Sequence, residues 1–496
     1  MNLRDLLHGV ASGPVAALPI AGIACHSKQV RPGDCFVAIE GSASDGHAFI
    51  EEAITRGASA IVAQRLPAWP RAGTPGARPC PCVVVQDSHE ALVVMASRFY
   101  GHPSRKLRLL GVTGTNGKTT TTYILKHILE ASGARAGLLG TIVYQIGQRI
   151  VPSVNTTPGP LELQRYFAQM VGEGLQWCAM EVSSHALAQG RVAGLEFEGA
   201  IFANLGSDHL DYHKTREAYA AAKRRLFEYL RPSGCAVINA DDDYGRTLAE
   251  TLPHGTVLTF GMEQPAKISV QDIRCSWQGI HLTLQTPWGP VPVSTPLLGR
   301  HNIWNIAAAA TTLMALGIEP HALQRGLASI ECVPGRLERV PNELDINIII
   351  DYAHTADALR LALRSLRELT RGRLIVVFGC GGNRDQTKRP VMGKIASLMA
   401  DHVILTSDNP RQEDPLDIIR QIKDGFQAGF SQHEVIPDRE QAIIAALARA
   451  RAEDTVLIAG KGHEAYQMFQ HIAVPFLDRD VVERWVDARR HTLVGT

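Results

Sequence analysis

Short apolar runs alternate with amphipathic segments along most of this chain of 496 residues. The runs predict buried strands at 35–39, 60–63, 83–85, 107–110, 177–180, 199–202, 235–238, 346–350, 374–378, 402–405 and 455–458. Helical patterns follow many of them, as at 46–56, 91–100, 121–130, 219–230 and 301–316. This alternation predicts an α/β fold with parallel sheets and with ligands at the carboxyl ends of the strands. Residues 265–298 instead alternate apolar and polar positions, which predicts an antiparallel insert.

The loop after the predicted strand at 107–110 carries the clearest chemical signal. Its glycines allow backbone N–H groups to close around phosphate oxygens, Lys118 adds a mobile cation, and Thr119 adds a hydroxyl for Mg²⁺. The spacing departs from the usual Walker pattern, because Val112 stands where that pattern has its first glycine. The loop predicts binding of a nucleoside triphosphate and leaves open how its energy is used. It reads Gly111-Val112-Thr113-Gly114-Thr115-Asn116-Gly117-Lys118-Thr119-Thr120.

Polar residues gather after other predicted strands as well. Glu181 directly follows a strand and is suited to hold Mg²⁺ as the acidic partner of the loop hydroxyl. The segment 204–213 contains two Asp and two His residues, which suggests a metal or catalytic site. Loops at 379–385 and 407–411 combine glycine or amide groups with arginine and are suited to anions. Lys223, by contrast, has the pattern of a solvated helix lysine.

Composition narrows the class of protein. The net charge of +1 gives no reason to expect nucleic acid or an anionic membrane as a partner. Nine cysteines are scattered without metal-ligand spacing, which favours reduced thiols in a cytoplasmic protein. No apolar run is long enough to span a bilayer. Residues 1–28 are rich in small and apolar residues but are interrupted by Gly and Pro, so we interpret them as part of a folded domain rather than a targeting sequence.

The chain is too long for a single core. The segments at 102–104 and 333–336 have the pattern of hinges between domains. They predict three domains, at 1–101, 102–335 and 336–496.

The motifs, in their order along the chain, resemble those of the Mur ligase family, the ATP-dependent amide-bond ligases of peptidoglycan precursor synthesis. The loop at 113–119 is similar to that family's phosphate loop, which accounts for Val112. The resemblance covers essentially the whole chain. It implies a smaller N-terminal α/β UDP-sugar-binding domain, a central P-loop ATPase-like domain with a parallel sheet, and a C-terminal Rossmann-like amino-acid-binding domain. Other matching motifs begin at Asn155, Glu181, Asp208, His301, Pro334, Asp351 and Gly460.

Within the family, the motif Asp408-Asn409-Pro410-Arg411 and the N-terminal motifs at 27–28, 33–38 and 45–46 are similar to those of MurE enzymes that add meso-diaminopimelate. The physical chemistry agrees with this resemblance. Diaminopimelate carries an ammonium and a carboxylate at its far end, where lysine has only an ammonium. Arg411 can pair with that carboxylate and would repel the bare cation of lysine.

The resemblance implies a reaction in peptidoglycan biosynthesis, and therefore a role in cell shape and division. The γ-phosphoryl group of ATP passes to the D-glutamyl carboxylate of UDP-MurNAc-L-Ala-D-Glu, and the amine of meso-diaminopimelate attacks the acyl phosphate to give the amide, ADP and phosphate. The implied cofactors are ATP, Mg²⁺ and CO₂, the last as a lysine carbamate. All expected partners are small molecules, with neither nucleic acid nor membrane, and a monomer is the default expectation.

The resemblance also assigns roles to residues. Lys118, Lys223 and His209 are the catalytic candidates, with Lys223 aligned to the family's carbamylated lysine. The implied metal ligands are Thr119, Glu181, His209 and the carbamate of Lys223. The implied ATP contacts are Gly114, Thr115, Asn116, Gly117, Lys118, Thr119, Thr120, Asn302, Arg336 and Asp351. The implied sugar and peptide contacts are Ser27, Asn155, Thr156, Thr157, Ser183, Gln189 and Arg191. The implied diaminopimelate contacts are Arg384, Asp408, Asn409, Arg411, Gly460 and Glu464.

Two departures from the family pattern affect details of these assignments. Gly206 and Ser207 replace Thr and a larger polar residue, next to an intact Asp-His pair. His26 and Lys28 replace the familiar Asp and the commoner Arg beside Ser27, which bears on the uridine contacts.

Three alternative functions stay open from the sequence. Two are ligases of the same superfamily, a lysine-adding MurE and the dipeptide-adding MurF. The third is a nucleotide-sensing binding protein that keeps the fold and no longer ligates. Arg411 argues against the first and the N-terminal motifs argue against the second. The joint presence of the phosphate loop, Glu181, His209 and Lys223 argues against the third.

Overall fold

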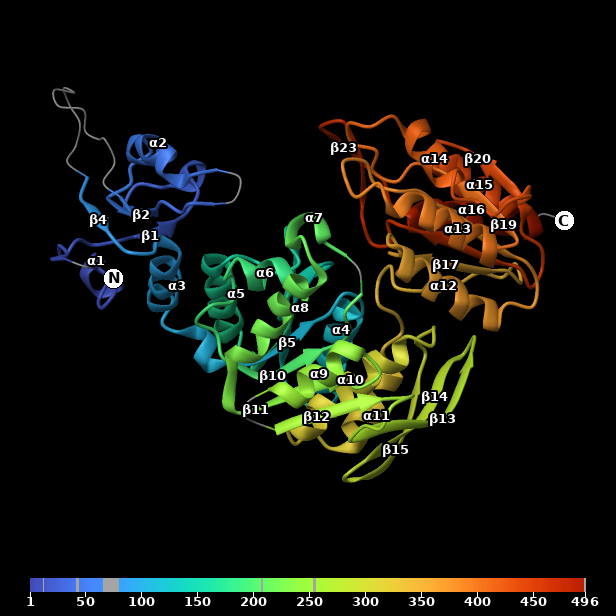
Figure 1. Cartoon of the computed structure of the whole chain (residues 1–496), viewed down its shortest axis with the longest axis horizontal. Coiled ribbons are helices and arrows are strands. Elements are labelled where there is room, and N and C mark those ends of the chain that lie inside the picture. Colours follow the sequence, from blue (N-terminus) through green and yellow to red (C-terminus); the bar gives the residue numbers. More distant parts are fainter. Residues whose placement is uncertain (12, 42–43, 66–79, 207, 253–255, 495–496) are drawn as a thin grey trace. The chain divides into compact units, whose positions relative to one another are not determined.

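The computed structural model describes residues 1–11, 13–41, 44–65, 80–206, 208–252 and 256–494. The chain divides into two compact units. Unit 1 consists of residues 1–111, 134–198 and 225–234, and unit 2 of residues 112–133, 199–224 and 235–496. Figure 1 shows the helices and strands of the chain, coloured from the N-terminus to the C-terminus.

Unit 1 begins with a small α/β sheet. Its four strands are all parallel, in the order β1-β2-β3-β4. Alternate residues of β2 point to opposite faces, so that Cys35 and Val37 pack with α1 and α3 while Phe36 packs with α2. The elements are α1 (Leu3–Leu6), β1 (Gly22–Ala24), η1 (Ser27–Gln29), β2 (Asp34–Val37), η2 (Gly46–Phe49), α2 (Ile50–Thr55), β3 (Ala60–Ala63), β4 (Cys82–Val84), α3 (Ser88–Phe99) and η3 (Pro103–Lys106).

The rest of unit 1 holds a second group of strands, paired in the order β9-β6-β7-β8. The β9–β6 pair is parallel, and β6, β7 and β8 form antiparallel pairs. Three strands, β5 (Arg108–Thr113), β10 (Phe197–Phe202) and β11 (Leu230–Asn239), have residues in both units. The other elements are β6 (Ala136–Leu139), β7 (Val143–Ile146), β8 (Arg149–Pro152), α5 (Pro160–Gly172), β9 (Trp177–Glu181), α6 (Ser184–Ala188) and η4 (Arg225–Tyr229).

Unit 2 begins with the helix that follows the glycine loop, α4 (Lys118–Ala131), which packs against α10 and α11. The strands β11 and β12 pair in parallel, and β13, β14 and β15 form the antiparallel insert that the alternating pattern predicts. The elements are α7 (Leu210–His213), α8 (Arg216–Arg224), α9 (Asp243–Thr251), β12 (Thr256–Gly261), β13 (Ile268–Ser276), β14 (Gly279–Thr286), β15 (Gly289–Thr295), α10 (Asn302–Ala315) and α11 (Pro320–Ser329).

The C-terminal part of unit 2 contains a six-stranded sheet in the order β16-β17-β21-β18-β19-β20, in which only β16 is antiparallel. A hairpin, β22–β23, follows the last core strand. The elements are β16 (Glu338–Val340), β17 (Asn347–Asp351), α12 (Ala356–Leu369), β18 (Leu374–Phe378), α13 (Lys388–Met399), β19 (His402–Leu405), α14 (Pro415–Lys423), β20 (His433–Val435), α15 (Arg439–Arg449), β21 (Thr455–Ala459), β22 (Tyr466–Phe469), β23 (Ile472–Pro475) and α16 (Asp478–Val494).

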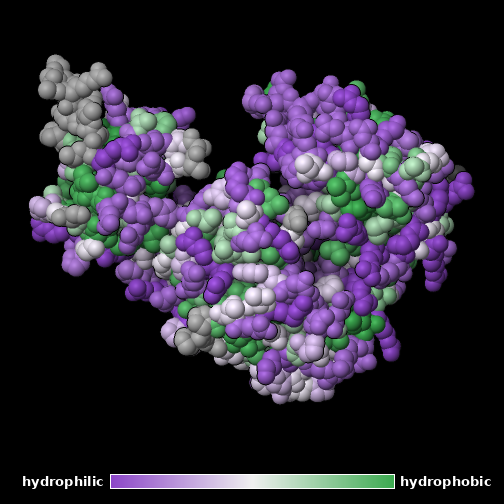
Figure 2. Space-filling view, viewed as in Figure 1, coloured by the Kyte–Doolittle hydropathy of each residue, from purple (hydrophilic) through white to green (hydrophobic). Residues whose placement is uncertain are grey.

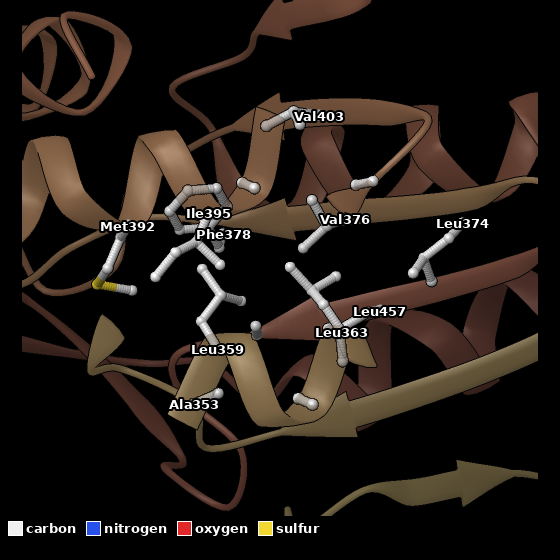
Figure 3. Packing of buried hydrophobic residues seen from close by; sticks show 14 of the residues in the cluster. Ala353, Leu359, Leu363, Leu374, Val376, Phe378, Met392, Ile395, Val403 and Leu457 are labelled. Carbon is white, nitrogen blue, oxygen red and sulfur yellow. The ribbon is translucent and has the colours of Figure 1, made fainter. Parts of the chain in front are cut away.

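Helices cover both faces of this sheet. Val376 and Phe378 of β18 pack with α12, α13 and α14, as Figure 3 shows for Leu359, Leu363 and Met392. The alternate residues Ile375 and Val377 pack with α15 and α16 on the other face. Each such fully buried side chain contributes about 1.5–3 kcal/mol relative to an exposed one. The three-layer packing leaves the carboxyl strand ends open for loops.

The surface agrees with the composition. In the view of Figure 2, hydrophilic residues cover much of the surface and hydrophobic ones form smaller patches. None of the helices in the described ranges combines the length and the apolar character needed to cross a bilayer. All nine cysteines are free thiols.

The predicted α/β class is confirmed, with parallel strands in all three parts of the chain. The N-terminal residues fold as we expected, with α1 and β1 buried in the first domain core. The predicted helix at 219–230 is shorter, because α8 ends at Arg224 and a 3₁₀ helix follows. The apolar runs did not indicate several strands, which are β1, β6, β7, β8, β12, β16, β20 and the β22–β23 hairpin. The three proposed domains stay a prediction.

Candidate functional site

The glycine loop joins β5 to α4. Val112, which stands where the usual pattern has its first glycine, is fully buried within β5. Asn204, at the end of β10, holds the loop from both sides: its Oδ1 accepts the Asn116 N–H at 2.9 Å and its Nδ2 donates to the Asn116 carbonyl at 3.1 Å. Gly117 has a φ of +87°, and a Cβ there would collide with Oδ1 of Asn305. The loop therefore requires glycine at this position.

Lys118 and Thr119 begin α4 directly after this glycine. The Lys118 Nζ donates to the carbonyls of Gly114 at 2.8 Å and Thr115 at 3.0 Å, so the side chain folds back over the loop. Arg336 donates from Nη2 to the Thr119 hydroxyl at 3.1 Å. Two predicted nucleotide contacts thus meet at the N-terminus of a 14-residue helix, a favourable place for phosphate. Thr120 is buried behind them.

A cavity of about 310 Å³ adjoins the loop. Its lining includes Asn116, Asp241, Phe260, Trp304 and Asn305. The indole N–H of Trp304 donates to Oδ2 of Asp241 at 2.7 Å, which fixes the ring in the wall. Aromatic walls with a few polar groups suit a flat heterocycle such as a nucleobase.

Two predicted ATP contacts turn their polar atoms toward the protein. Asn302 is buried, donates to the Leu298 carbonyl at 2.6 Å and accepts from Asn305 at 2.8 Å. The Asp351 carboxylate accepts the N–H groups of Leu337 at 2.6 Å and Ala353 at 2.8 Å. Burial raises the pKa of Asp351, against the lowering effects of Arg336 and these hydrogen bonds. Both residues support the backbone around the site, whereas Asn305, which the sequence did not single out, lines the cavity.

Lys223 corrects an expectation, because the bare sequence indicated a solvated helix lysine. Its side chain is 1% exposed, on the face of α8 that packs inward with Tyr219 and Ala220. The Lys223 Nζ lies 4.2 Å from the centroid of the Tyr219 ring. Burial lowers the pKa of Lys223 well below its ordinary value, the positive charge of Lys118 lowers it further, and Asp208 opposes the shift. An uncharged amine at such a site is a nucleophile.

The residues of the acidic and histidine-rich segment 208–213 do not gather at one place. The His209 Nε2 lies 3.6 Å from Oδ2 of Asp208. Burial tends to raise the pKa of Asp208, but His209, His354 and Lys118 lower it overall. His213 is buried against Tyr219, with ring centroids 5.2 Å apart, and Asp211 is exposed. Ser207 lies outside the described residues, and those that are described contain no cluster of three or more His, Cys, Asp or Glu side chains able to hold a metal.

Glu181 ends β9 in unit 1 and is 1% exposed. Thr141 donates to it twice, from its N–H to Oε1 at 2.7 Å and from its hydroxyl to Oε2 at 3.0 Å. A Cβ at Gly140 would collide with the same carboxylate. The Gly-Thr pair after β6 thus fixes Glu181, although sequence reasoning did not identify Thr141.

Most of the predicted sugar and peptide contacts gather near Glu181. Arg191 donates to Oε1 of Gln189 from two nitrogens, at 2.8 and 3.0 Å, and to the Thr157 carbonyl at 2.9 Å. The Thr157 hydroxyl accepts the Ser183 N–H at 3.0 Å. Thr156 and Asn155 belong to the same loop, which contacts Thr141 and Tyr144. Ser27 is held elsewhere in unit 1, where its hydroxyl donates to Glu52 at 2.7 Å.

In the C-terminal sheet, two strand-end loops meet through Asn409 and Glu464. The Asn409 Nδ2 donates to Oε2 of Glu464 at 2.8 Å, and the Tyr352 hydroxyl donates to Oε1 at 3.3 Å. Lys461, a residue that sequence reasoning gave no role, donates to Oε2 of Glu464 at 3.1 Å. Gly460 has a φ of +111° and lies against the Asp408 carboxylate.

Arg411 lies two residues beyond Asn409 and has an unusual backbone. Its φ is +53°, and the β22–β23 hairpin holds it by hydrogen bonds from Arg411 N–H to the Met468 carbonyl at 2.9 Å and from Gln470 N–H to the Arg411 carbonyl at 2.6 Å. The guanidinium donates to the Gly382 carbonyl at 2.7 Å. Arg384 is exposed on the same glycine loop. The predicted diaminopimelate contacts therefore converge at one edge of the sheet.

Comparison with known proteins identifies the class. Residues 19–100 match the family model described as Mur ligase family, catalytic domain, residues 112–313 match the Mur ligase middle domain, and residues 335–462 match the Mur ligase glutamate ligase domain. The chain belongs to the Mur ligase family.

Particular relatives are similar over nearly the full length. UDP-N-acetylmuramoyl-L-alanyl-D-glutamate--2,6-diaminopimelate ligase of Geobacillus kaustophilus is 44% identical over 95% of each chain, and the enzyme of that name from Gloeobacter violaceus is 44% identical over 99% of each. A solved structure of a ligase with this name is 32% identical, with a TM-score of 0.70 over 99% of each chain. MurF ligase from Thermotoga maritima, solved with ADP, shares the fold at 22% identity and a TM-score of 0.64, over 96% of this chain and 98% of that one.

Proposed function

We propose that the chain is an ATP-dependent, ADP-forming ligase that adds meso-diaminopimelate to UDP-MurNAc-L-Ala-D-Glu in peptidoglycan precursor biosynthesis. The full-length relatives at 44% identity that carry this activity in their names support the proposal. The observation that carries the choice of amino acid is the 2.8 Å hydrogen bond between Asn409 and Glu464 beside Arg411. The bond joins the Glu464 carboxylate to an amide two residues before Arg411, and an anion and a guanidinium would together suit an end group bearing both charges.

The first step activates a poor electrophile. A carboxylate oxygen of D-Glu attacks the γ-phosphorus of ATP, the bond to the β,γ-bridging oxygen breaks, and ADP leaves with that electron pair. Lys118 and the N–H groups of the loop would stabilise the charge on the transferring group. The cavity beside Trp304 would hold the base, and Arg336 would contact the nucleotide from the C-terminal segment.

The second step forms the amide. The neutral amine of diaminopimelate attacks the acyl carbon, the tetrahedral intermediate collapses with loss of phosphate, and the amine proton passes to solvent or to a nearby base. Water must be excluded, because it would hydrolyse the acyl phosphate.

Mg²⁺ and CO₂ are the proposed cofactors. The Thr119 hydroxyl and the buried Glu181 carboxylate are oxygen donors of the kind that Mg²⁺ prefers, and His209 would add a nitrogen. Bound Mg²⁺ would offset phosphate charge. The low pKa of the Lys223 amine favours carbamate formation, in which Nζ bonds to the carbon of CO₂ and a proton is released. The carbamate oxygens would then be a further metal ligand.

The remaining assignments follow the same proposal. Residues 155–157 and 183–191 with Ser27 would contact the UDP-sugar peptide, and the three matched segments support domains at 1–101, 102–335 and 336–496. The proposed enzyme acts in the cytoplasm as a monomer on small molecules only.

An amino-acid panel tests the proposed function. Phosphate release from ATP is measured with UDP-MurNAc-L-Ala-D-Glu and, in turn, diaminopimelate, L-lysine or no amine, and with UDP-MurNAc-tripeptide and D-Ala-D-Ala. We expect rapid phosphate release with diaminopimelate, and none with L-lysine, with D-Ala-D-Ala or without an amine. Equal turnover with lysine would support a lysine-adding enzyme, and turnover with D-Ala-D-Ala a MurF-type ligase. ATP binding without release in any mixture would indicate a nucleotide-sensing protein.

A further inference from the structure

Lys461 is a fully buried cation that the proposed reaction does not use. It lies between Gly460 and Gly462, whose positive φ values of +111° and +53° turn the loop so that the lysine side chain points inward. Burying an ammonium group is costly unless it is paired and hydrogen-bonded. Lys461 satisfies this condition with two acceptors, both on residues of the proposed amino-acid site.

The first acceptor is Asn409. The Lys461 Nζ donates to Oδ1 of Asn409 at 3.2 Å, and the backbone N–H of Met468 donates to the same oxygen at 2.9 Å. Two donors on one oxygen fix the orientation of the amide, because the NH₂ group cannot occupy that position. The Asn409 NH₂ must therefore face Glu464 and the ligand side of the loop. In this orientation Asn409 offers a ligand only N–H groups, which suit a carboxylate.

The second acceptor is Glu464. The Lys461 Nζ donates to Oε2 at 3.1 Å, the oxygen that also accepts from Asn409. The Glu464 carboxylate is partly exposed, and its Oε1 accepts only the longer bond from Tyr352, at 3.3 Å, among the hydrogen bonds described for it. Oε2 is thus occupied by two donors of the protein, whereas Oε1 has one long hydrogen bond among those described for it.

We propose that Lys461 is a positioning residue for recognition of the amino acid. It orients the Asn409 amide toward a carboxylate and anchors Glu464 by one oxygen, so that Oε1 receives an ammonium group. This inference rests on the proposed function and deepens it: the ligand it describes is an amino acid whose far end carries both charges. Lys461 is too deeply buried to touch the substrate and acts through its two partners.

A double-mutant cycle separates this role from a general contribution to folding. Steady-state phosphate release is measured for the wild-type chain, Lys461→Met, Glu464→Gln and the double variant, with diaminopimelate and ATP varied in turn. Lys461→Met should raise the KM for diaminopimelate at least about tenfold, because a buried charge pair is broken, while the KM for ATP changes less than about twofold. In the Glu464→Gln background, the same substitution should add less than about threefold, since the carboxylate is already gone and the Asn409 oxygen is still held by the N–H of Met468. Lys394→Met, which removes an exposed lysine from α13, is the matched control and should match the wild type.

Additive effects in the cycle, or equal rises of both KM values, would overturn the proposal. If Lys461→Met does not fold, the comparison of Glu464→Gln with the double variant decides, because the double variant retains no unpaired buried charge. Failure of the proposed function is distinguishable, since the wild-type chain itself would then show no phosphate release with diaminopimelate.

Discussion

The phosphate loop and the C-terminal amino-acid site differ in the groups that accept hydrogen bonds from their buried or partly buried cations. At the phosphate loop, Lys118 folds over the neutral carbonyls of Gly114 and Thr115, at the positive end of a helix. At the C-terminal site, two fully buried cations are held by carboxylates of the protein: Lys461 by Glu464 at 3.1 Å, and Arg389 by Glu413 at 2.7 Å. The first arrangement suits a highly charged triphosphate, and the second suits a zwitterion.

This difference has a structural basis. The phosphate loop is a single contiguous segment, which Asn204 holds by accepting the N–H groups of Thr115 and Asn116. The amino-acid site is assembled from three separate strand-end loops and the β22–β23 hairpin. The fully buried ion pair of Arg439 and Asp478 joins the first residues of α15 and α16, and Arg439 also donates to the Ala459 carbonyl, at the end of β21, at 3.1 Å. The comparison teaches that variants at the first site should alter chemistry, and variants at the second should alter amino-acid affinity.

The largest expected effect is at the phosphate loop. Lys118→Ala removes the cation placed to stabilise the transferring phosphoryl group, and we expect turnover to fall by at least about 10³-fold. Phosphate release at saturating substrates measures it. Lys106→Ala, which removes an exposed lysine just before β5, is the control. Retained activity in Lys118→Ala would refute the role of the loop.

The next effect concerns Lys223. Because burial lowers its pKa, the amine is uncharged, and so ready to react with CO₂, at pH values below the ordinary lysine pKa. If Lys223 carries the proposed carbamate, Lys223→Ala should lower turnover by about 10²-fold or more, since a metal ligand is lost. A short carboxylic acid added to the assay should restore part of the activity. Full activity without CO₂ or bicarbonate would rule out the carbamate.

Arg411 should show the opposite kinetic pattern to Lys118. Arg411→Ala removes charged hydrogen bonds worth about 1.5–3 kcal/mol, so the KM for diaminopimelate should rise about 10- to 150-fold with little change in the KM for ATP. Arg411→Lys should recover only part of the lost affinity for diaminopimelate, because lysine lacks the planar guanidinium group. The exposed Arg420, removed as Arg420→Ala, is the matched control. A selective loss of ATP affinity would contradict the division between the two sites.

The smallest effect tests how Glu181 is held. Thr141→Val removes one hydrogen bond to Glu181 and keeps the side-chain shape, so turnover should fall about five- to tenfold, equivalent to about 1 kcal/mol. Thr141→Ser retains the hydroxyl and should stay near the wild type. Equal losses in both variants would point to packing rather than to the hydroxyl.

The sequence predicted the fold class and the strand, glycine loop and helix around Lys118, because both depend on local patterns: apolar runs for the strands, and closely spaced glycines for the loop. Burial of Lys223 was not predictable, since it depends on which face of α8 packs inward. The role of Thr141 was not predicted because its partner Glu181 lies 40 residues away, and that of Lys461 because one of its two partners, Asn409, lies 52 residues away. The β22–β23 hairpin consists of short strands with mostly exposed side chains, so its hold on Arg411 appears only in the folded chain.

A competition experiment tests the central claim most directly. The chain is incubated with ATP, Mg²⁺, UDP-MurNAc-L-Ala-D-Glu and equal concentrations of meso-diaminopimelate and L-lysine, and the products are identified by mass spectrometry. We expect one amide product, with the mass of the diaminopimelate adduct, formed together with equal amounts of ADP and phosphate. A predominant lysine adduct, or consumption of ATP without any amide, would contradict the account.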